Sequence, residues 1–364
     1  FNFTSSAPLP AQRLQVFPMA KASLTSDRPK VTIYDVADEA GVAISTVSRV
    51  LNDSKEVSDK TRAKVEAAIE KLRFKPQRTA KTLAQQQTHS LAVAMPSTTS
   101  LFYVEILKGV KDTLREHDID LLLCNLGSTS PYQTLQRFLA RGAVDALLLA
   151  SLPIDDNLEK ELMKLHAPVV IVGVNHPKFD CIYLNDRIGA GKAVEHLISI
   201  GHRRIGMISP HPWSYVTDER IQGYRSALED AGIPFDPSLI ASGDTLKHAG
   251  FSEESGAEAM KKLLALPDPP TAVFVASDVQ AFGAWSEMRS RDQQVPDHMS
   301  LVAYDNLKLS RYLRLTTVDQ KMYEVGKLAT DRLLQRIKSD TDERINRYVE
   351  PELVVRSSTA PLQG

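Results

Sequence analysis

The sequence is poor in cysteine and has no long apolar run. Its 364 residues include only two cysteines, Cys124 and Cys181, which stand in apolar, strand-like surroundings and lack the spacing of a disulfide framework or a metal site. We expect both to be reduced core residues. No stretch of 18 apolar residues occurs, so no transmembrane helix is encoded. These absences predict a cytoplasmic protein without a membrane partner.

Catalytic and cofactor-binding patterns are also missing. The sequence contains no Ser/His/Asp, Cys/His or metal-ligand constellation, and no glycine-rich phosphate loop follows a predicted strand. It therefore predicts a protein that is not an enzyme and that holds neither a metal ion nor a cofactor.

Net charge is almost absent, but the basic residues are unevenly distributed. The chain carries 44 Lys or Arg and 45 Asp or Glu, whereas residues 28–89 hold twelve basic against eight acidic residues. The densest basic run contains no acidic residue and includes Lys71, Arg73, Lys75, Arg78 and Lys81. A solvated charged face has the same composition, but basic residues gathered in one segment are what binding to a phosphate backbone requires.

Residues 31–52 contain two short helical patterns on either side of Gly41. Thr32 and Asp35 form a capping-box-like start, and Gly41 stands where a helix C-cap takes the left-handed conformation. Apolar residues recur at helical spacing, namely Val36, Ala37 and Ala40 in the first pattern and Val47, Val50 and Leu51 in the second. This pattern is typical of a helix-turn-helix, although a fragment of another small helical bundle has the same spacing.

The second helical pattern has a polar face that suits DNA. Opposite its apolar side stand short hydroxyls, one apolar tip and one guanidinium, on Ile44, Ser45, Thr46, Ser48 and Arg49. Such side chains match base edges, thymine methyls and phosphates in a major groove. A third helix is predicted after the N-cap Ser58, with a stripe that closes a three-helix core, formed by Thr61, Val65, Ala68, Ile69 and Leu72.

From Ser90 onward, short apolar runs alternate with helical stretches. Nine runs are predicted to be strands, in two series: 90–96, 119–124, 144–150, 167–174 and 181–185, then 204–209, 239–244, 271–277 and 300–305. Continuously apolar strands that alternate with helices predict parallel sheets covered on both faces. The two series therefore predict two doubly wound α/β lobes, with a ligand site between them at the carboxyl ends of the strands.

Eight stretches carry a family resemblance. In the N-terminal part these are DVADEAGVAISTVSRVLN (35–52), VSDKTRAKVEAAIEKLRFKP (57–76) and RTAKTLA (78–84). Farther along they are GHRRIG (201–206), ERIQGYRSAL (219–228), VASDVQAFGA (275–284), LVAYDNL (301–307) and LVVRSSTAP (353–361). Together they resemble the lactose-repressor (LacI/GalR) family of bacterial transcription regulators, over about nine tenths of the chain.

The resemblance implies a division into four parts. Residues 1–28 are expected to be a disordered leader, 29–76 a helix-turn-helix DNA-binding domain and 77–88 a hinge helix. Residues 89–364 are expected to form a periplasmic-binding-protein-like core of two lobes, which binds an effector and dimerises.

The resemblance also implies which residues bind DNA. They are Thr32, Ile44, Ser45, Thr46, Ser48, Arg49, Arg78, Lys81 and Leu83. Leu83 matches the apolar wedge that such a hinge inserts into the minor groove at the central base step. Ala43 departs from the family pattern, because a capping residue such as serine usually precedes the second helix and alanine caps poorly.

The effector-binding residues implied by the resemblance are Phe102, Tyr103, Asp186, Arg220, Phe251 and Asp278. Arg220 offers a fork of donors and Asp278 two acceptor oxygens, which suits a polyhydroxylated ring. A plain salt bridge between the lobes is the alternative for this pair. Asn185 is the alternative to Asp186, because the family often has Asp-Asn where this chain reads Asn-Asp. His211 and Trp213, in a proline-bounded loop, either tune effector choice or only cover the lobe.

The resemblance implies a homodimeric transcriptional repressor. We expect it to bind a pseudo-palindromic DNA operator with an affinity that a small-molecule effector controls, a sugar in the main interpretation. A purine or nucleoside effector is the alternative within the family, and a solute-binding protein, which needs a signal peptide and no helix-turn-helix, is the alternative outside it. Met19 suits the start of such a regulator, so residues 1–18 are expected to contribute nothing to function.

Overall fold

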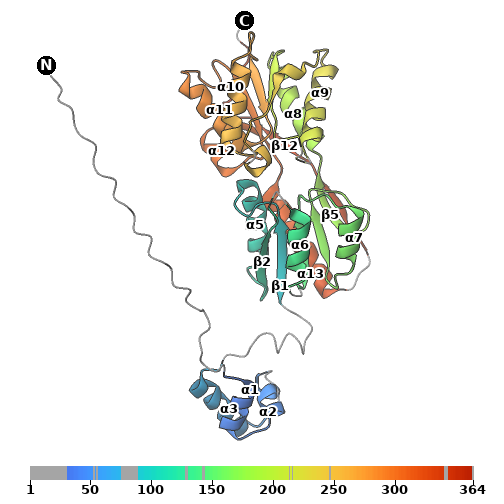
Figure 1. The fold of residues 1–364 in the computed structure, drawn as a ribbon, viewed down its shortest axis with the longest axis vertical. Helices are drawn as coiled ribbons and strands as arrows, with labels where there is room; N and C mark the ends of the chain where they lie inside the picture. Colours follow the sequence, from blue (N-terminus) through green and yellow to red (C-terminus); the bar gives the residue numbers. More distant parts are fainter. Residues whose placement is uncertain are drawn as a thin grey trace, which may run out of the picture. The chain divides into compact units, whose positions relative to one another are not determined.

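The computed structural model describes residues 31–51, 54, 56–74, 89–127, 130–141, 144–212, 214, 216–245, 247–339 and 343–362. The chain forms two compact units, residues 1–84 and 85–364 (Figure 1). The predicted leader and hinge, and Trp213, lie outside the described residues. Below, the first unit is called the head and the second the core.

The head is a bundle of three helices, α1 (Ile33–Ala40), α2 (Ile44–Leu51) and α3 (Asp59–Leu72). Val36, Val47 and Val65 are completely buried at its centre, where the predicted apolar stripes meet. Gly41 ends α1 with a φ of 62°, a conformation that glycine adopts without steric cost. The predicted helix-turn-helix is thereby confirmed.

Local hydrogen bonds explain where these helices begin. The backbone N–H and the hydroxyl of Thr32 both donate to the Asp35 carboxylate at 2.7 Å, which also lowers the pKa of Asp35. Ser58 caps α3 by accepting from the Thr61 N–H at 3.4 Å. In α2 the Ala43 carbonyl accepts from the Val47 N–H at 3.2 Å, the first α-helical bond, and also from the Thr46 N–H at 2.9 Å, whereas the Ala43 methyl supplies no cap. Helix α2 therefore begins at Ile44 without the side-chain bond that a serine provides.

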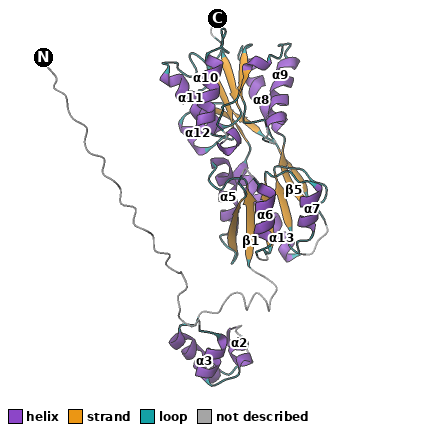
Figure 2. Cartoon of the chain, in the orientation of Figure 1, coloured by secondary structure: helices purple, strands orange, loops and turns teal. Residues whose placement is uncertain are grey.

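Lobe 1 of the core is a parallel sheet with the strand order β11-β5-β4-β3-β1-β2. Helices α5 and α13 cover one face and α6 and α7 the other (Figure 2). The bounds are β1 (Ser90–Met95), β2 (Asp120–Asn125), β3 (Ala146–Ala150), β4 (Val169–Val172), β5 (Asp180–Leu184), β11 (Asn346–Val349), α5 (Leu101–Leu114), α6 (Pro131–Leu139), α7 (Asp156–Met163) and α13 (Met322–Lys338).

Lobe 2 repeats this plan with the strand order β12-β10-β9-β8-β6-β7. All its neighbouring strands are parallel except β12, which pairs antiparallel with β10. Helices α8 and α9 cover one face, and α10 and α11 cover the other. The bounds are β6 (Ile205–Ile208), β7 (Ile240–Ala241), β8 (Ala272–Val275), β9 (Ser300–Tyr304), β10 (Thr316–Asp319), β12 (Glu352–Val354), α8 (Asp186–Ser199), α9 (Thr217–Asp230), α10 (Glu253–Leu264), α11 (Asp278–Ser290) and α12 (Lys308–Tyr312), with short 3-10 turns at Pro237–Leu239 and Lys247–Gly250.

The chain passes between the lobes three times, so neither lobe is one continuous segment. The passages lie between β5 and α8, between β10 and α13, and between β11 and β12. Helix α13 returns to lobe 1 and packs closely on α5. Glycine at position 326 allows this close approach, since a Cβ there would lie 2.1 Å from the Ile106 carbonyl oxygen. All nine predicted strands are present as β1–β9, whereas β10, β11 and β12 were not predicted.

The expectation for the two cysteines agrees with the described structure. Cys124 and Cys181 are free and buried, and burial raises the pKa of both thiols. Among the residues that the structure describes, no helix has the length and apolar character needed to cross a membrane.

Candidate functional site

The polar face of α2 projects from the head. Ile44, Ser45 and Arg49 are exposed, and Ile44 retains 41% of its accessible surface despite its apolar side chain. Thr46 and Ser48 are half-buried. The apolar face of the helix packs into the head core, so these five side chains contribute little to folding and stay available to a partner.

Arg49 and Thr32 have contacts of their own within the head. The Arg49 guanidinium lies 3.6 Å from the Glu56 carboxylate, an exposed pair that contributes little to stability. The Thr32 hydroxyl is bound to Asp35. Arg78, Lys81 and Leu83, the other predicted DNA contacts, lie outside the described residues.

In lobe 2, Arg220 is the centre of a buried polar cluster. It lies on α9 with only 5% of its side chain exposed, and its Nε and Nη2 donate to Asp186 at 2.8 and 2.7 Å. Its Nη1 donates to the Ala276 carbonyl at the end of β8. The nearby Asp186 carboxylate raises the pKa of Arg220 against the opposing effect of burial, so the guanidinium stays charged. Asn185 instead caps α8 by accepting from the Ile188 N–H at 3.0 Å.

Two aromatic rings flank the Arg220 guanidinium. Its central carbon lies 4.0 Å from the ring centroid of Tyr304 and 6.0 Å from that of Phe251. Tyr304 lies close to α8 because residue 189 is glycine, and a Cβ there would be 2.0 Å from the tyrosine hydroxyl. The structure thus brings together three of the predicted effector residues, Asp186, Arg220 and Phe251.

Asp278 is not the partner of Arg220. It is completely buried at the start of α11, where its Oδ1 accepts from the Thr317 hydroxyl at 2.6 Å. Its Oδ2 accepts from the Leu307 N–H at 2.7 Å and from the Ser310 hydroxyl. Burial raises the pKa of Asp278 to about 6. Arg220 pairs with Asp186 inside lobe 2, so the alternative of an Arg220–Asp278 salt bridge between the lobes is wrong.

Asp305 was not predicted as a site residue, and it directly follows Tyr304, whose ring lies against Arg220. It has a φ of 119°, and its Oδ1 accepts from the Gln320 amide at 2.7 Å. Burial raises the pKa of Asp305 well above its ordinary value, and the Arg220 charge opposes that shift. A carboxylate directly after the apolar run LVAY was the available signal, and Asp278 likewise follows a predicted apolar strand.

The remaining predicted residues belong to other parts of the core. Phe102 and Tyr103 lie in the first turn of α5 in lobe 1, with ring centroids 5.0 Å apart, and pack on the lobe 1 core. In lobe 2 the His211 N–H donates to the Ala249 carbonyl at 3.0 Å, and the His211 carbonyl accepts from Thr217 at 2.9 Å. The backbone of His211 therefore joins the loop before α9 to the segment that leads to Phe251.

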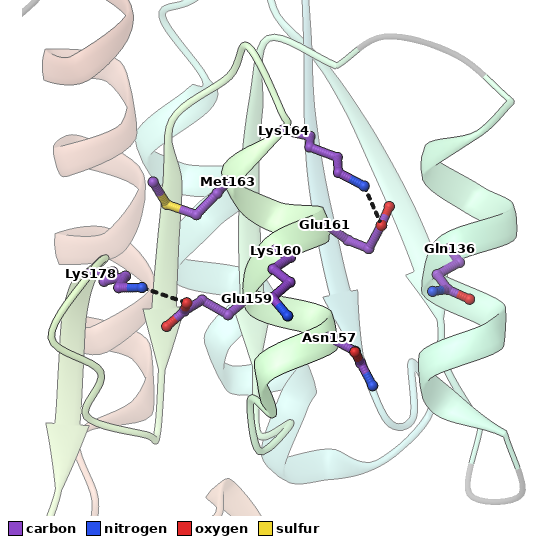
Figure 3. A pocket seen from close by; sticks show the side chains of 8 residues that line it. All are labelled: Gln136, Asn157, Glu159, Lys160, Glu161, Met163, Lys164 and Lys178. Atoms are coloured by element: carbon purple, nitrogen blue, oxygen red, sulfur yellow. Dashed lines mark hydrogen bonds and ion pairs between the residues drawn. The ribbon is translucent and has the colours of Figure 1, made fainter.

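A surface hollow on lobe 1 is a separate feature (Figure 3). It is lined by Gln136, Asn157, Glu159, Lys160, Glu161, Met163, Lys164 and Lys178. Lys178 pairs with Glu159 at 2.6 Å and Lys164 with Glu161 at 2.8 Å, so much of its charge is neutralised locally. None of the predicted site residues lines it, and we assign it no ligand.

Comparison with known proteins identifies the family. Residues 32–77 match the model of bacterial regulatory proteins of the lacI family, and residues 194–359 match a periplasmic binding protein-like domain. The chain is 34% identical over 337 residues to the HTH-type transcriptional repressor PurR of Photobacterium profundum, covering 91% of this chain and 99% of PurR.

Two solved structures are similar over the same extent. A complex of the transcriptional regulator CelR with cellobiose is 33% identical, with a TM-score of 0.64, and a lac repressor dimer bound to operator and an anti-inducer is 30% identical, with a TM-score of 0.75. Each comparison covers 91% of this chain and all of the other chain. The chain therefore belongs to the lacI family of bacterial regulatory proteins and is a DNA-binding transcriptional regulator.

Proposed function

We propose that this regulator is a repressor, that it binds a two-fold symmetric operator as a homodimer, and that a small neutral carbohydrate bound beside Arg220 controls its affinity for DNA. The observation that carries the effector assignment is the buried Arg220, which is paired with Asp186 and lies 4.0 and 6.0 Å from the ring centroids of Tyr304 and Phe251. The cluster stands at the carboxyl ends of lobe 2 strands, where α/β sheets bind their ligands.

The head supplies the DNA-reading surface. Ile44, Ser45 and Arg49, with Thr46 and Ser48 beside them, enter the major groove, and Thr32 approaches the backbone. From the hinge, Arg78 and Lys81 contact phosphates and Leu83 inserts into the minor groove. The lac repressor dimer, a relative bound to its operator, supports this arrangement.

The effector is held mainly from lobe 2. Arg220 keeps its fixed geometry through Asp186 and offers donors, Asp186 and Asp305 offer acceptors, and Phe251 packs on the ring. Phe102 and Tyr103 contribute from lobe 1. Paired carboxylates and one guanidinium suit vicinal hydroxyls, and a similar regulator, CelR, is described with cellobiose. A purine or nucleoside effector is the alternative, which Phe251 alone supports weakly.

Exposed apolar side chains mark a surface for a second copy of the chain. In lobe 1 they lie on α5 and on the edge strand β2, and in lobe 2 on α12, at Leu101, Leu122, Leu123, Leu309, Tyr312 and Leu313. Figure 1 shows α5, β2 and α12 along one side of the core in that view. Exposed apolar side chains that gather on one side of a protein mark interaction surfaces, and these support a homodimer through this face.

A binding selection followed by a ligand screen tests the proposal. The full chain is incubated with random double-stranded oligonucleotides, and the retained sites are expected to be two-fold symmetric. Thermal shift is then measured with sugars, polyols, sugar phosphates and purines, because a ligand of the native state raises the melting temperature. A retained site without symmetry contradicts the dimeric repressor. A shift with purines alone contradicts the carbohydrate assignment.

A further inference from the structure

The turn between β9 and α12 has a strained backbone. Asp305 and Asn306 have φ values of 119° and 52°, in a region that residues with a side chain rarely adopt. Such conformations persist only where the surroundings impose them, and they gather at binding sites and switches. The contacts that hold this turn therefore bear directly on where the Asp305 carboxylate lies.

Strand β10 and the segment after it hold one side of the turn. The Asp305 N–H donates to the Val318 carbonyl at 2.8 Å, and the Asn306 N–H donates to the Thr317 hydroxyl at 3.2 Å. Three side chains add bonds: Gln320 donates to Asp305 at 2.7 Å, Asn306 donates to Asp319 at 2.9 Å, and Arg356 donates to Asn306 at 2.6 Å.

Asp278 holds the other side. Its Oδ2 accepts from the N–H of Leu307, the residue that follows the strained pair, and from Ser310 in the first turn of α12. Its Oδ1 accepts from Thr317, the same hydroxyl that receives the Asn306 N–H. One buried carboxylate thus bridges the turn, β10 and α12, and its removal leaves three buried donors without an acceptor.

We propose that Asp278 is a positioning residue of the effector site. It fixes the turn that directly follows Tyr304, whose ring centroid lies 4.0 Å from the Arg220 guanidinium carbon, and through Ser310 it connects that turn to the exposed apolar helix α12. The inference rests on the proposed effector site, and it gives Asp278 a supporting role there.

Hydrogen–deuterium exchange of the full chain without ligand tests this role. Asp278→Ala is expected to speed amide exchange in peptides covering residues 305–313 at least tenfold. Asp278→Asn is expected to stay within threefold of the parent, since its amide oxygen still accepts from Leu307 and Ser310 and its amide group can donate to the Thr317 oxygen. A crystal structure of Asp278→Ala is expected to show the Asp305 carboxylate displaced from the Gln320 amide.

Gln280→Ala is the matched control. Gln280 is also completely buried in the first turn of α11, but it donates to the Ser209 carbonyl after β6, at 3.2 Å, and not to the turn. Exchange over 305–313 should therefore match the parent. Unchanged exchange in Asp278→Ala, or an equal rise in Gln280→Ala, overturns the inference.

A second variant is used if Asp278→Ala does not fold. Thr317→Val removes one of the hydrogen-bond donors to Asp278 at nearly constant volume, and it should also speed amide exchange over residues 305–313. Unchanged exchange in Thr317→Val overturns the inference. Because no ligand enters these measurements, a screen that finds no carbohydrate contradicts the proposed function alone.

Discussion

The head and lobe 2 place their functional side chains in opposite ways. In α2, Ile44, Ser45 and Arg49 are exposed, while a separate apolar face builds the head core. In lobe 2, Arg220 and Asp186 are nearly buried, so the groups proposed to bind the effector also hold the lobe together. The difference teaches that recognition is separable from folding in the head and coupled to it in lobe 2.

This contrast has an energetic reason. An exposed polar side chain without a protein partner costs little free energy, because water takes the place of that partner. A buried charge must be paired and hydrogen-bonded, and removing one member of the pair leaves the other uncompensated. Substitutions in lobe 2 should therefore change stability and binding together, whereas substitutions on the polar face of α2 should change binding only.

The largest effect is expected from Arg220→Ala. It leaves the Asp186 carboxylate buried without its partner, which costs about 3–5 kcal/mol of unfolding free energy. Urea unfolding of the core measures the loss. Arg225→Ala, on the same helix, is the control, because Arg225 forms an exposed pair with Glu229 and its removal should cost less than about 1 kcal/mol. Equal losses in the two variants contradict the coupling of site and fold in lobe 2.

The next effect is a pH dependence. Burial raises the pKa of Asp278 to about 6 from an ordinary 3.8, so the folded state holds this proton more tightly than the unfolded state. The resulting stability is complete below about pH 4 and is lost as pH rises through 6, a change of about 3 kcal/mol. Asparagine does not titrate, so the Asp278→Asn variant lacks this loss of stability. The unfolding free energy of the variant minus that of the parent should therefore rise from pH 4 to pH 7.

Glu254 provides the control for the change of unfolding free energy with pH. Hydrogen bonds from Lys247 and its neighbours lower the pKa of this exposed carboxyl to about 2, so its contribution is constant above pH 4.5. Glu254→Gln should therefore leave the slope between pH 4.5 and 7 as in the parent. A parent and an Asp278→Asn variant with parallel pH curves contradict the raised pKa of Asp278.

The same contrast explains what could be predicted from the sequence. Helix positions in the head follow from contacts three or four residues apart, so Gly41, Ser58 and the stripe around Val47 were placed correctly. The nine strands β1–β9 followed from continuous apolar runs. Strands β11 and β12 were missed because NRYV and ELV are short and partly exposed, with no apolar run to mark them.

The effector cluster was only partly predictable, because its members meet through long-range topology. Arg220, Asp186 and Asp305 come from three segments that meet only when lobe 2 folds, and no spacing rule assigns one carboxylate to a guanidinium 34 or more residues away. Asp278 and Asp305 carry the same signal, a carboxylate after an apolar strand. Only the structure shows that the first is fully bound within the lobe and that the second accepts from Gln320 directly after Tyr304.

A pair of substitutions in α2 sharpens the comparison at a smaller scale. Val47→Ala removes buried methyl groups and should destabilise the head by about 2 kcal/mol. Ile44→Ala, one turn away on the exposed face, should change stability by less than about 0.5 kcal/mol and yet weaken operator binding at least tenfold. Chemical denaturation and operator titration of both variants measure the two effects. An Ile44→Ala variant with parental operator affinity contradicts the role of this face in reading DNA.

The smallest expected effect is a gain. Ala43 precedes α2 and offers only its carbonyl to the helix, so the first N–H groups of α2 lack a side-chain acceptor at this position. Ala43→Ser places a hydroxyl where it can accept from the Thr46 N–H, a capping bond worth about 1 kcal/mol. Because the change is at the exposed start of the helix, it should stabilise the head without altering the core, and the melting transition of the head should rise alone.

Ser58→Ala, which removes the corresponding cap of α3, should lower stability by a similar amount. If Ala43→Ser raises stability but lowers operator affinity, the side chain at position 43 itself lies against the DNA, and folding and recognition are coupled in the head as is proposed for lobe 2.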